Sequence, residues 1–201
     1  MSEELFFRTI ANYCDLSPQA RSAWAALLRP KQYARNSQFV TEGQIPATAA
    51  FVVTGLFAQY YTAPDGNSVV KYFFPEGRIA ASVSAMLLDQ PSRFTITALE
   101  PSTVLEYDFA GFKQLVTRFA DVAVFYIRYM ERHWIIEKEP MEISLRHDSA
   151  VTRYQNFVRQ HALLLPRLKQ HTIAAYLGIT PESLSRMKKE LGQEPPAAPD
   201  S

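Results

Sequence analysis

The chain has 201 residues, of which 47% are hydrophobic and 20% are charged, and its formal net charge at pH 7 is +1. This length and composition suit one large folded domain or two small ones. The single cysteine, Cys14, excludes an internal disulfide and an all-cysteine zinc or iron–sulfur site within one chain. No run of about 18 apolar residues is present and the first residues are acidic, so we expect no membrane contact and a cytoplasmic protein.

Residues 3–29 are predicted to be helical, because apolar side chains recur there at three- and four-residue spacing. Within this region Ser17 suits the N-cap of a helix, and Pro18 suits its first position. Pro30 is expected to end the helical region.

From about residue 31 to residue 107, short β-branched and aromatic runs alternate with turn signals, which is typical of an antiparallel all-β sandwich or barrel. Residues 64–67 have the composition of a hairpin turn. The predicted strands cover residues 38–41, 50–53, 56–62, 68–74, 93–98 and 103–107.

Helical spacing returns at Phe109 and continues to about Arg146. Apolar residues cover more of this long helix than one β-domain can bury, so we expect a second copy of the chain to cover the rest. Pro140 should kink or end the helix, because it removes an intrahelical hydrogen bond. Asp148 or Ser149 could cap a further helix. Residues 163–166 are expected to end that helix.

The segment from residue 172 to residue 191 has the pattern of two short helices joined by a tight turn. Gly178 suits the turn, Thr180 the N-cap of the second helix and Pro181 its first position. One side of the second helix is apolar, and the other presents short polar and charged side chains, as a reader of the DNA major groove requires. The alternative is an ordinary helical hairpin with a solvated polar face.

Basic residues are concentrated in the same part of the chain. Residues 146–191 carry eight Lys/Arg and three Asp/Glu, whereas residues 1–145 carry 13 Lys/Arg and 15 Asp/Glu. Phosphate binding would require this excess of positive charge, although a solvated helical surface could show the same imbalance.

The order of β-domain, long helix and two-helix motif resembles the CRP/FNR family of bacterial transcription regulators. The resemblance spans about residues 20–191 and rests most on Ile173–Arg186. The glycines of the β-region match the family's cyclic-nucleotide-binding-type β-roll less specifically; they are Gly43, Gly55, Gly66 and Gly77. The implied fold is α+β, with an antiparallel, jelly-roll-like β-roll as sensor domain.

The resemblance also implies a domain order. Residues 1–118 would form the β-roll with its N-terminal helices, residues 119–147 a dimerisation helix and hinge, and residues 148–191 a helix-turn-helix domain. Residues 192–201 lack core-forming side chains and are expected to be disordered.

A regulator of this family would act as a homodimer on double-stranded DNA, with RNA polymerase as a further partner. By position, Glu182 and Arg186 correspond to the principal base-contacting residues. The full set expected at DNA is Thr180, Glu182, Ser183, Ser185, Arg186, Lys188 and Lys189. The residues expected at the dimer interface are Val122, Phe125, Tyr129 and Met130.

The sensing site is expected to be degenerate. Nucleotide-binding members hold the ligand with a Gly-Glu pair and a later Arg-Ser/Thr pair, which here fall on Ala81–Ser82 and Ser92–Arg93. Neither the carboxylate nor the guanidinium stands in its place, and Arg93, one position late, should point to the opposite face of its strand. We therefore expect no binding of cyclic AMP or cyclic GMP, and the small-molecule effector stays unidentified. Aromatic residues of the β-region could line an apolar pocket or simply pack in the core.

No nucleophile–base pair, P-loop, zinc-ligand spacing or Rossmann glycine pattern is present in the sequence. We therefore do not expect the protein to be an enzyme or to bind a cofactor. The four histidines lie outside the predicted β-domain, and no metal site is expected. The second interpretation of the chain is a ligand-sensing or protein-interaction module that does not read DNA sequence.

Overall fold

The computed structural model describes residues 2–64 and 66–192. Within them, two four-stranded antiparallel sheets form a roll, with strand orders β1-β8-β3-β6 and β2-β7-β4-β5. The strands are β1 (Arg29–Tyr33), β2 (Gln38–Val40), β3 (Thr48–Thr54), β4 (Phe57–Thr62), β5 (Ser68–Phe74), β6 (Ile79–Ala80), β7 (Thr95–Ala98) and β8 (Ser102–Asp108).

All six predicted strands are confirmed, and two strands were missed. The helical region ends at Ala25 rather than at Pro30, which lies inside β1, the edge strand of its sheet. An edge strand tolerates proline because its outward N–H has no ladder partner to lose. The other missed strand, β6, has two residues and is too short to show a period in the sequence.

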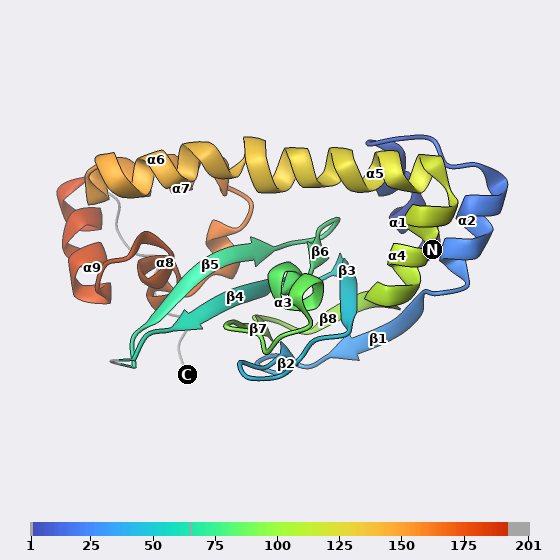
Figure 1. Cartoon of the computed structure of the whole chain (residues 1–201). Coiled ribbons are helices and arrows are strands. Elements are labelled where there is room, and N and C mark those ends of the chain that lie inside the picture. Colours follow the sequence, from blue (N-terminus) through green and yellow to red (C-terminus); the bar gives the residue numbers. More distant parts are fainter. Residues whose placement is uncertain (1, 65, 193–201) are drawn as a thin grey trace.

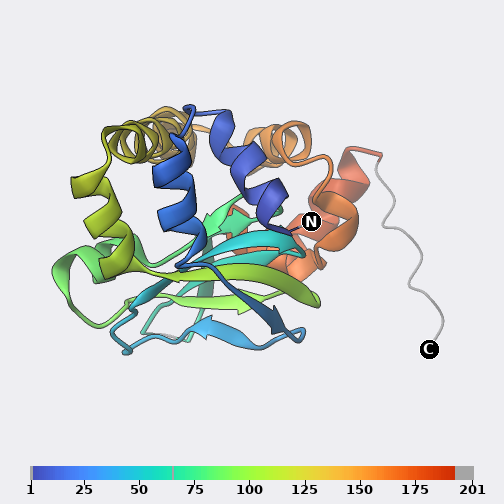
Figure 2. The same cartoon turned by 90° about the vertical axis from the view of Figure 1, so that its right-hand side faces the viewer.

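Helices α1 (Ser2–Ala11) and α2 (Pro18–Ala25) cover one face of the roll together with α4 (Phe109–Arg118), as Figure 2 shows. The Ser17 side chain caps α2 by accepting from the backbone N–H of Ala20, and Pro18 follows it as predicted. The core below these helices centres on Trp24, which is fully buried against the rings of Phe112 and Phe125. A short helix that the sequence did not predict, α3 (Val83–Leu88), follows β6.

The predicted long helix is interrupted at Phe119, whose extended backbone separates α4 from the rest. Beyond it, α5 (Ala120–Met130), the π-helical turn η1 (Glu131–Ile136) and α6 (Lys138–His147) run along the top of the molecule as one rod (Figure 1). The rod does not end at Pro140, because Pro140 lies in the first turn of α6, where N–H groups have no intrahelical acceptor. The α-helical hydrogen bonding is instead interrupted just before it, where Glu137 donates to Arg132.

The C-terminal part contains α7 (Ala150–Gln160), the 3₁₀ turn η2 (Leu165–Arg167), α8 (Gln170–Leu177) and α9 (Pro181–Glu190). Ser149, not Asp148, caps α7. These helices pack against β4 and β5, next to the rod (Figure 1). Phe73 of β5, for example, stacks on Tyr176 of α8 at 5.2 Å between ring centres.

Side chains of β4 and β5 alternate between two cores, as the period of a strand requires. Phe57 and Phe74 point into the roll, while Ala58 and Phe73 point outward to the C-terminal helices.

No helix of the described residues is long and apolar enough to cross a membrane. Part of the predicted hairpin turn, Asp65, and the predicted disordered tail from residue 193 onward lie outside the described residues.

Candidate nucleic-acid interface and ligand sites

The pair of helices α8 and α9 is built as its sequence predicts. Gly178 ends α8 in the left-handed conformation, with φ 67° and ψ 36°. Thr180 caps α9 by accepting from the backbone N–H of Ser183 at 3.2 Å, and Pro181 is its first residue. Leu184 and Met187 are buried against α7 and α8, so the orientation of α9 is fixed by packing.

The opposite side of α9 is open to solvent. Glu182, Arg186 and Lys189 are exposed, and their spacing of four and three residues places them on one face. Thr180 is exposed at the N-terminal end of the same helix. Hydrogen bonds from its own backbone amide and from Thr180 lower the pKa of Glu182, which keeps this carboxylate ionised.

The remaining residues expected at DNA are less accessible. Ser183, Ser185 and Lys188 are half-buried at the edges of the exposed face. Lys188 Nζ lies 5.9 Å from the ring centre of Tyr154, and burial lowers the pKa of its amine. Lys189 is therefore better placed than Lys188 to reach a phosphate.

The residues expected at the dimer interface are mostly packed inside the chain. Val122, Phe125 and Tyr129 are buried in the core beneath α1 and α2, and Met130 is half-buried. Other apolar side chains of the rod are exposed, with exposed fractions between 38% and 66%. They are Val124, Ile127, Ile135, Ile136, Ile143 and Leu145.

The structure brings Ser82 and Ser92 together. Their hydroxyl oxygens lie 2.9 Å apart, and the two residues are 1% and 2% exposed. Ser92 donates to the carbonyl of Phe94 at 2.7 Å, so Ser82 is the donor between the two hydroxyls. Ala81 is buried beside this pair, whereas Arg93 is exposed.

The interior of the roll is filled by side chains rather than open. Phe57, Phe74 and Ile96 are buried between the two sheets, with Tyr33 packed on Phe57 at 5.5 Å between ring centres. Two larger cavities, of about 860 and about 630 Å³, lie outside the roll, between β5, the rod and the C-terminal helices.

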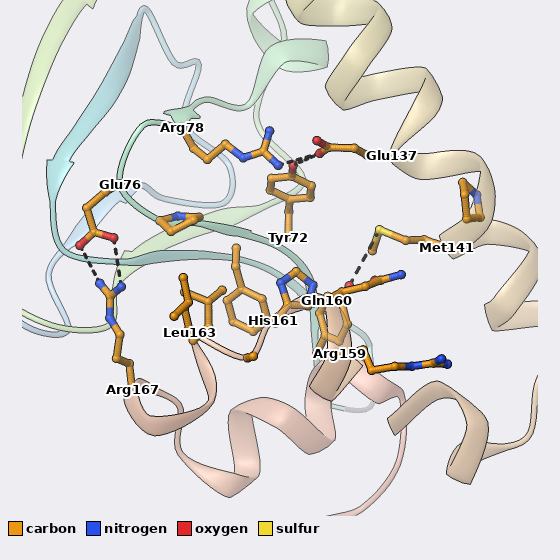
Figure 3. Close-up of a pocket in the computed structure, with 16 residues that line it drawn as sticks. Tyr72, Glu76, Arg78, Glu137, Met141, Arg159, Gln160, His161, Leu163 and Arg167 are labelled. Atoms are coloured by element: carbon orange, nitrogen blue, oxygen red, sulfur yellow. Dashed lines mark hydrogen bonds and ion pairs between the residues drawn. The ribbon is translucent and has the colours of Figure 1, made fainter. Parts of the chain in front are cut away.

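Figure 3 shows the larger of these cavities. Two ion pairs flank it: Arg78 contacts Glu137 at 2.7 Å, and Arg167 contacts Glu76 at 2.9 Å. Arg167 also contacts Glu100 at 2.5 Å, so this one side chain ties η2 to two turns of the roll. In Figure 3, His161 lies below Tyr72 and the Arg78–Glu137 pair, next to Gln160.

A buried polar cluster lies directly behind the first ion pair. His133 is 5% exposed, and its ring contacts Arg78, the hydroxyl of Tyr13 at 2.6 Å and Glu137 at 3.0 Å. Burial raises the pKa of Glu137, but hydrogen bonds from His133 and Arg78 outweigh this and lower it to about 2. Burial lowers the pKa of His133. This cluster links the end of α1, the start of β6 and the π-helical turn, and the sequence did not predict it.

Residues 30–119 match the family model described as "Cyclic nucleotide-binding domain". No curated protein matches the chain. Among solved structures, FixK2 from Bradyrhizobium japonicum is similar at 18% identity, with a TM-score of 0.70 over 83% of this chain and 85% of that chain. CLP from Xanthomonas campestris, described as a c-di-GMP responsive global regulator, is similar at 13% identity and a TM-score of 0.69, over 88% and 92% of the two chains.

The catabolite activator protein of Thermus thermophilus is also similar, at 15% identity and a TM-score of 0.55, over 92% of this chain and 87% of that chain. At these identities the similarity establishes the fold. Residues 30–119 thus have the fold of a cyclic nucleotide-binding domain. A protein from Eubacterium rectale, described as a "putative transcriptional regulator of the crp/fnr family", is also among the structural neighbours, at 16% identity and a TM-score of 0.64 over 89% of this chain and 84% of that chain.

Proposed function

We propose that this protein is a transcription regulator of the CRP/FNR type that binds double-stranded DNA as a homodimer, with α9 in the major groove. The observation that carries the proposal is the split of α9 into two faces. Leu184 and Met187 fix one face to the protein, and Glu182, Arg186 and Lys189 stand free on the other. A reading helix needs such a rigidly held, solvent-facing row of side chains.

Each exposed residue suits a distinct contact. Arg186 can donate two hydrogen bonds to the O6 and N7 atoms of guanine, and Glu182 can accept from the cytosine amine. Lys189 and Thr180 suit contacts to phosphates, which fix the position of the helix but carry no sequence information. Ser183, Ser185 and Lys188 border this face and would contact DNA only at its margin.

A homodimer would be joined along the outer side of the rod, where Ile127 and Ile135 are exposed. Val122, Phe125 and Tyr129 would act indirectly, by holding the rod to its own roll. Because a twofold interface is self-complementary, two α9 helices would face a near-palindromic site with half-sites about one helical turn apart. The family likeness extends the proposal to RNA polymerase as a partner.

The effector in this proposal is not a cyclic nucleotide. Two neutral hydroxyls occupy the positions that correspond to the ligand-binding carboxylate and guanidinium of the nucleotide-binding members. Buried and bonded to each other, Ser82 and Ser92 offer no positive charge to a cyclic phosphate.

Selection from random duplexes tests the DNA-reading role. We expect one enriched, roughly palindromic motif. On this motif Arg186→Ala should lose about 1–3 kcal/mol of binding free energy and relax the preference at one position per half-site. Lys189→Ala should weaken binding to all sequences equally and lower the salt slope by about one unit. Arg93→Ala, which removes an exposed arginine of the roll, is the matched control and should change neither property.

Two results would contradict the proposal. One is the absence of any enriched motif, which would favour a ligand-sensing or protein-interaction module. The other is an Arg186→Ala protein that binds the selected motif as tightly as the parent.

A further inference from the structure

The smaller of the two interdomain cavities has a volume of about 630 Å³, which suits a small organic molecule. We call it the Lys71 cavity. Its wall combines residues of the roll, of α6 and of α7 and α8, and it is mostly apolar. Its principal apolar side chains are Val69, Phe94, Met141, Ile143, Leu145 and Phe157.

One cation in this wall, Lys71, has no anionic partner among the described residues. Lys71 lies on β5, and its Nζ atom is 4.0 Å from the ring centre of Phe94 and 5.8 Å from that of Trp134. Within the described part of the chain it makes no hydrogen bond and no ion pair. A half-buried ammonium between two aromatic rings has lost much of its hydration without gaining an anion.

The charges around Lys71 leave room for an anion. The Nζ atom of a second cation, Lys138, lies 4.4 Å from the centre of the Trp134 ring. Burial first, and then the charge of Lys138, lower the pKa of Lys71 to about 8, so it is still mainly protonated at neutral pH. The carboxylate of Asp148, which lines the cavity, is already bonded by Ser144 at 2.7 Å. Glu139 lies on the exposed rim.

We propose that the Lys71 cavity binds a small organic acid with an apolar body, whose carboxylate pairs with Lys71. The acyl chain or ring would lie against Phe94, Ile143 and Leu145, and the acid group would supply the counter-ion that Lys71 lacks. A polar ligand such as a nucleotide would not fit this wall, because it would leave its sugar and base edges against aliphatic side chains.

A ligand at this place would touch the parts of the protein that must act together. Lys71 and Phe94 belong to the roll, Ile143 and Leu145 to the rod, and Leu177 and Gly178 to the turn that precedes α9. A bound acid would stabilise the packing of α8 and α9 on the roll relative to any arrangement that opens the cavity. This regulatory consequence rests on the proposed function, whereas binding of the acid does not.

Tryptophan fluorescence can report the binding directly. The chain has two tryptophans, and Trp24 is fully buried in the N-terminal core, so Trp134 beside Lys71 is the reporter. We would titrate decanoate, kept below its micelle-forming concentration, and compare it with the neutral analogue decanol. Decanoate should give a saturable change in emission that Trp134→Phe abolishes.

Substitution of Lys71 separates the contribution of charge to binding from that of hydrophobic contact. Lys71→Gln should weaken decanoate binding about 10- to 100-fold and leave decanol binding unchanged, because only the acid uses the ammonium. Lys113→Gln is the matched control, since Lys113 also lies over an aromatic ring, that of Tyr126 at 4.8 Å, but outside the cavity. It should change neither affinity.

Three results would overturn the inference: equal affinity for decanoate and decanol, an unchanged affinity in Lys71→Gln, or decanoate binding that appears only in a monomeric variant. The last result would mean that a second copy of the chain fills the cavity. The titration contains no DNA, so a protein that binds decanoate but no operator would disprove the proposed function alone.

Discussion

At the scale of single residues, Ser82 and Ser92 form a closed hydrogen-bonded pair in the roll. Their hydroxyls satisfy each other and the backbone of Phe94, so the pair is complete without a ligand. Residues 30–119 have the fold of a cyclic nucleotide-binding domain, and yet this pair lacks the charges that such a ligand needs. We infer that this chain keeps the fold of such a domain without its nucleotide-binding chemistry.

We expect cyclic AMP not to bind with useful affinity. Each missing charge-assisted hydrogen bond is worth about 1.5–3 kcal/mol, so the loss of two weakens binding by a factor of hundreds or more. Titration calorimetry should show no saturable heat up to about 1 mM cyclic AMP. Micromolar binding that Arg93→Ala abolishes would instead show that Arg93 turns inward and replaces the missing guanidinium.

At the scale of elements, the turn between α8 and α9 positions α9, the helix that we propose reads DNA. Gly178 has a φ of +67°, and an added Cβ atom would meet nothing within 4 Å. The cost of a side chain there is therefore conformational and not steric.

Gly178→Ala should lower the free energy of unfolding by about 1 kcal/mol, which for a chain of this size shifts Tm by about 2–4 °C. Gly178→Asn should cost less, because asparagine tolerates the left-handed region better than alanine. Thermal unfolding followed by circular dichroism measures both. An Asn variant as unstable as the Ala variant would show that the left-handed backbone is not the cause.

Local signals explain which elements were predictable. Ser17, Thr180 and Gly178 act on backbone groups a few residues away, so their roles follow from the sequence. The break at Phe119 and the π-helical turn carry no such signal. The Tyr13–His133 contact joins residues 120 positions apart, and nothing local indicates it.

At the scale of the whole molecule, the C-terminal helices are docked on the outer face of β4 and β5. Phe73 stacks on Tyr176, and Arg167 contacts Glu76 and Glu100. The sequence predicts β5 as a strand, but it does not show which partner covers the outward face of that strand. For the same reason the two interdomain cavities could not be predicted, since each is lined by segments far apart in the chain.

The burial of the rod could likewise be predicted only in part. The sequence indicated a helix with too many apolar side chains to be fully solvated, but it could not show which of them face the chain's own core and which face outward. Phe125 is 1% exposed and faces the chain's own core, whereas Ile127, two residues later, is 55% exposed. A charge at Phe125 would therefore unfold the protein and say nothing about subunit contacts.

The cleaner test of the homodimer places charges on the outer side of the rod. The double variant Ile127→Glu with Ile135→Glu should sediment as a monomer, because a twofold interface would bring four carboxylates together in an apolar contact. Leu87→Glu with Leu88→Glu, two exposed leucines of α3, is the matched control and should stay dimeric. The monomeric variant should keep its folded far-UV spectrum and lose the preference for palindromic over single half-sites, since only a dimer presents two α9 helices. A parent protein that sediments as a monomer at all concentrations, or a rod variant that stays dimeric, would place the interface elsewhere.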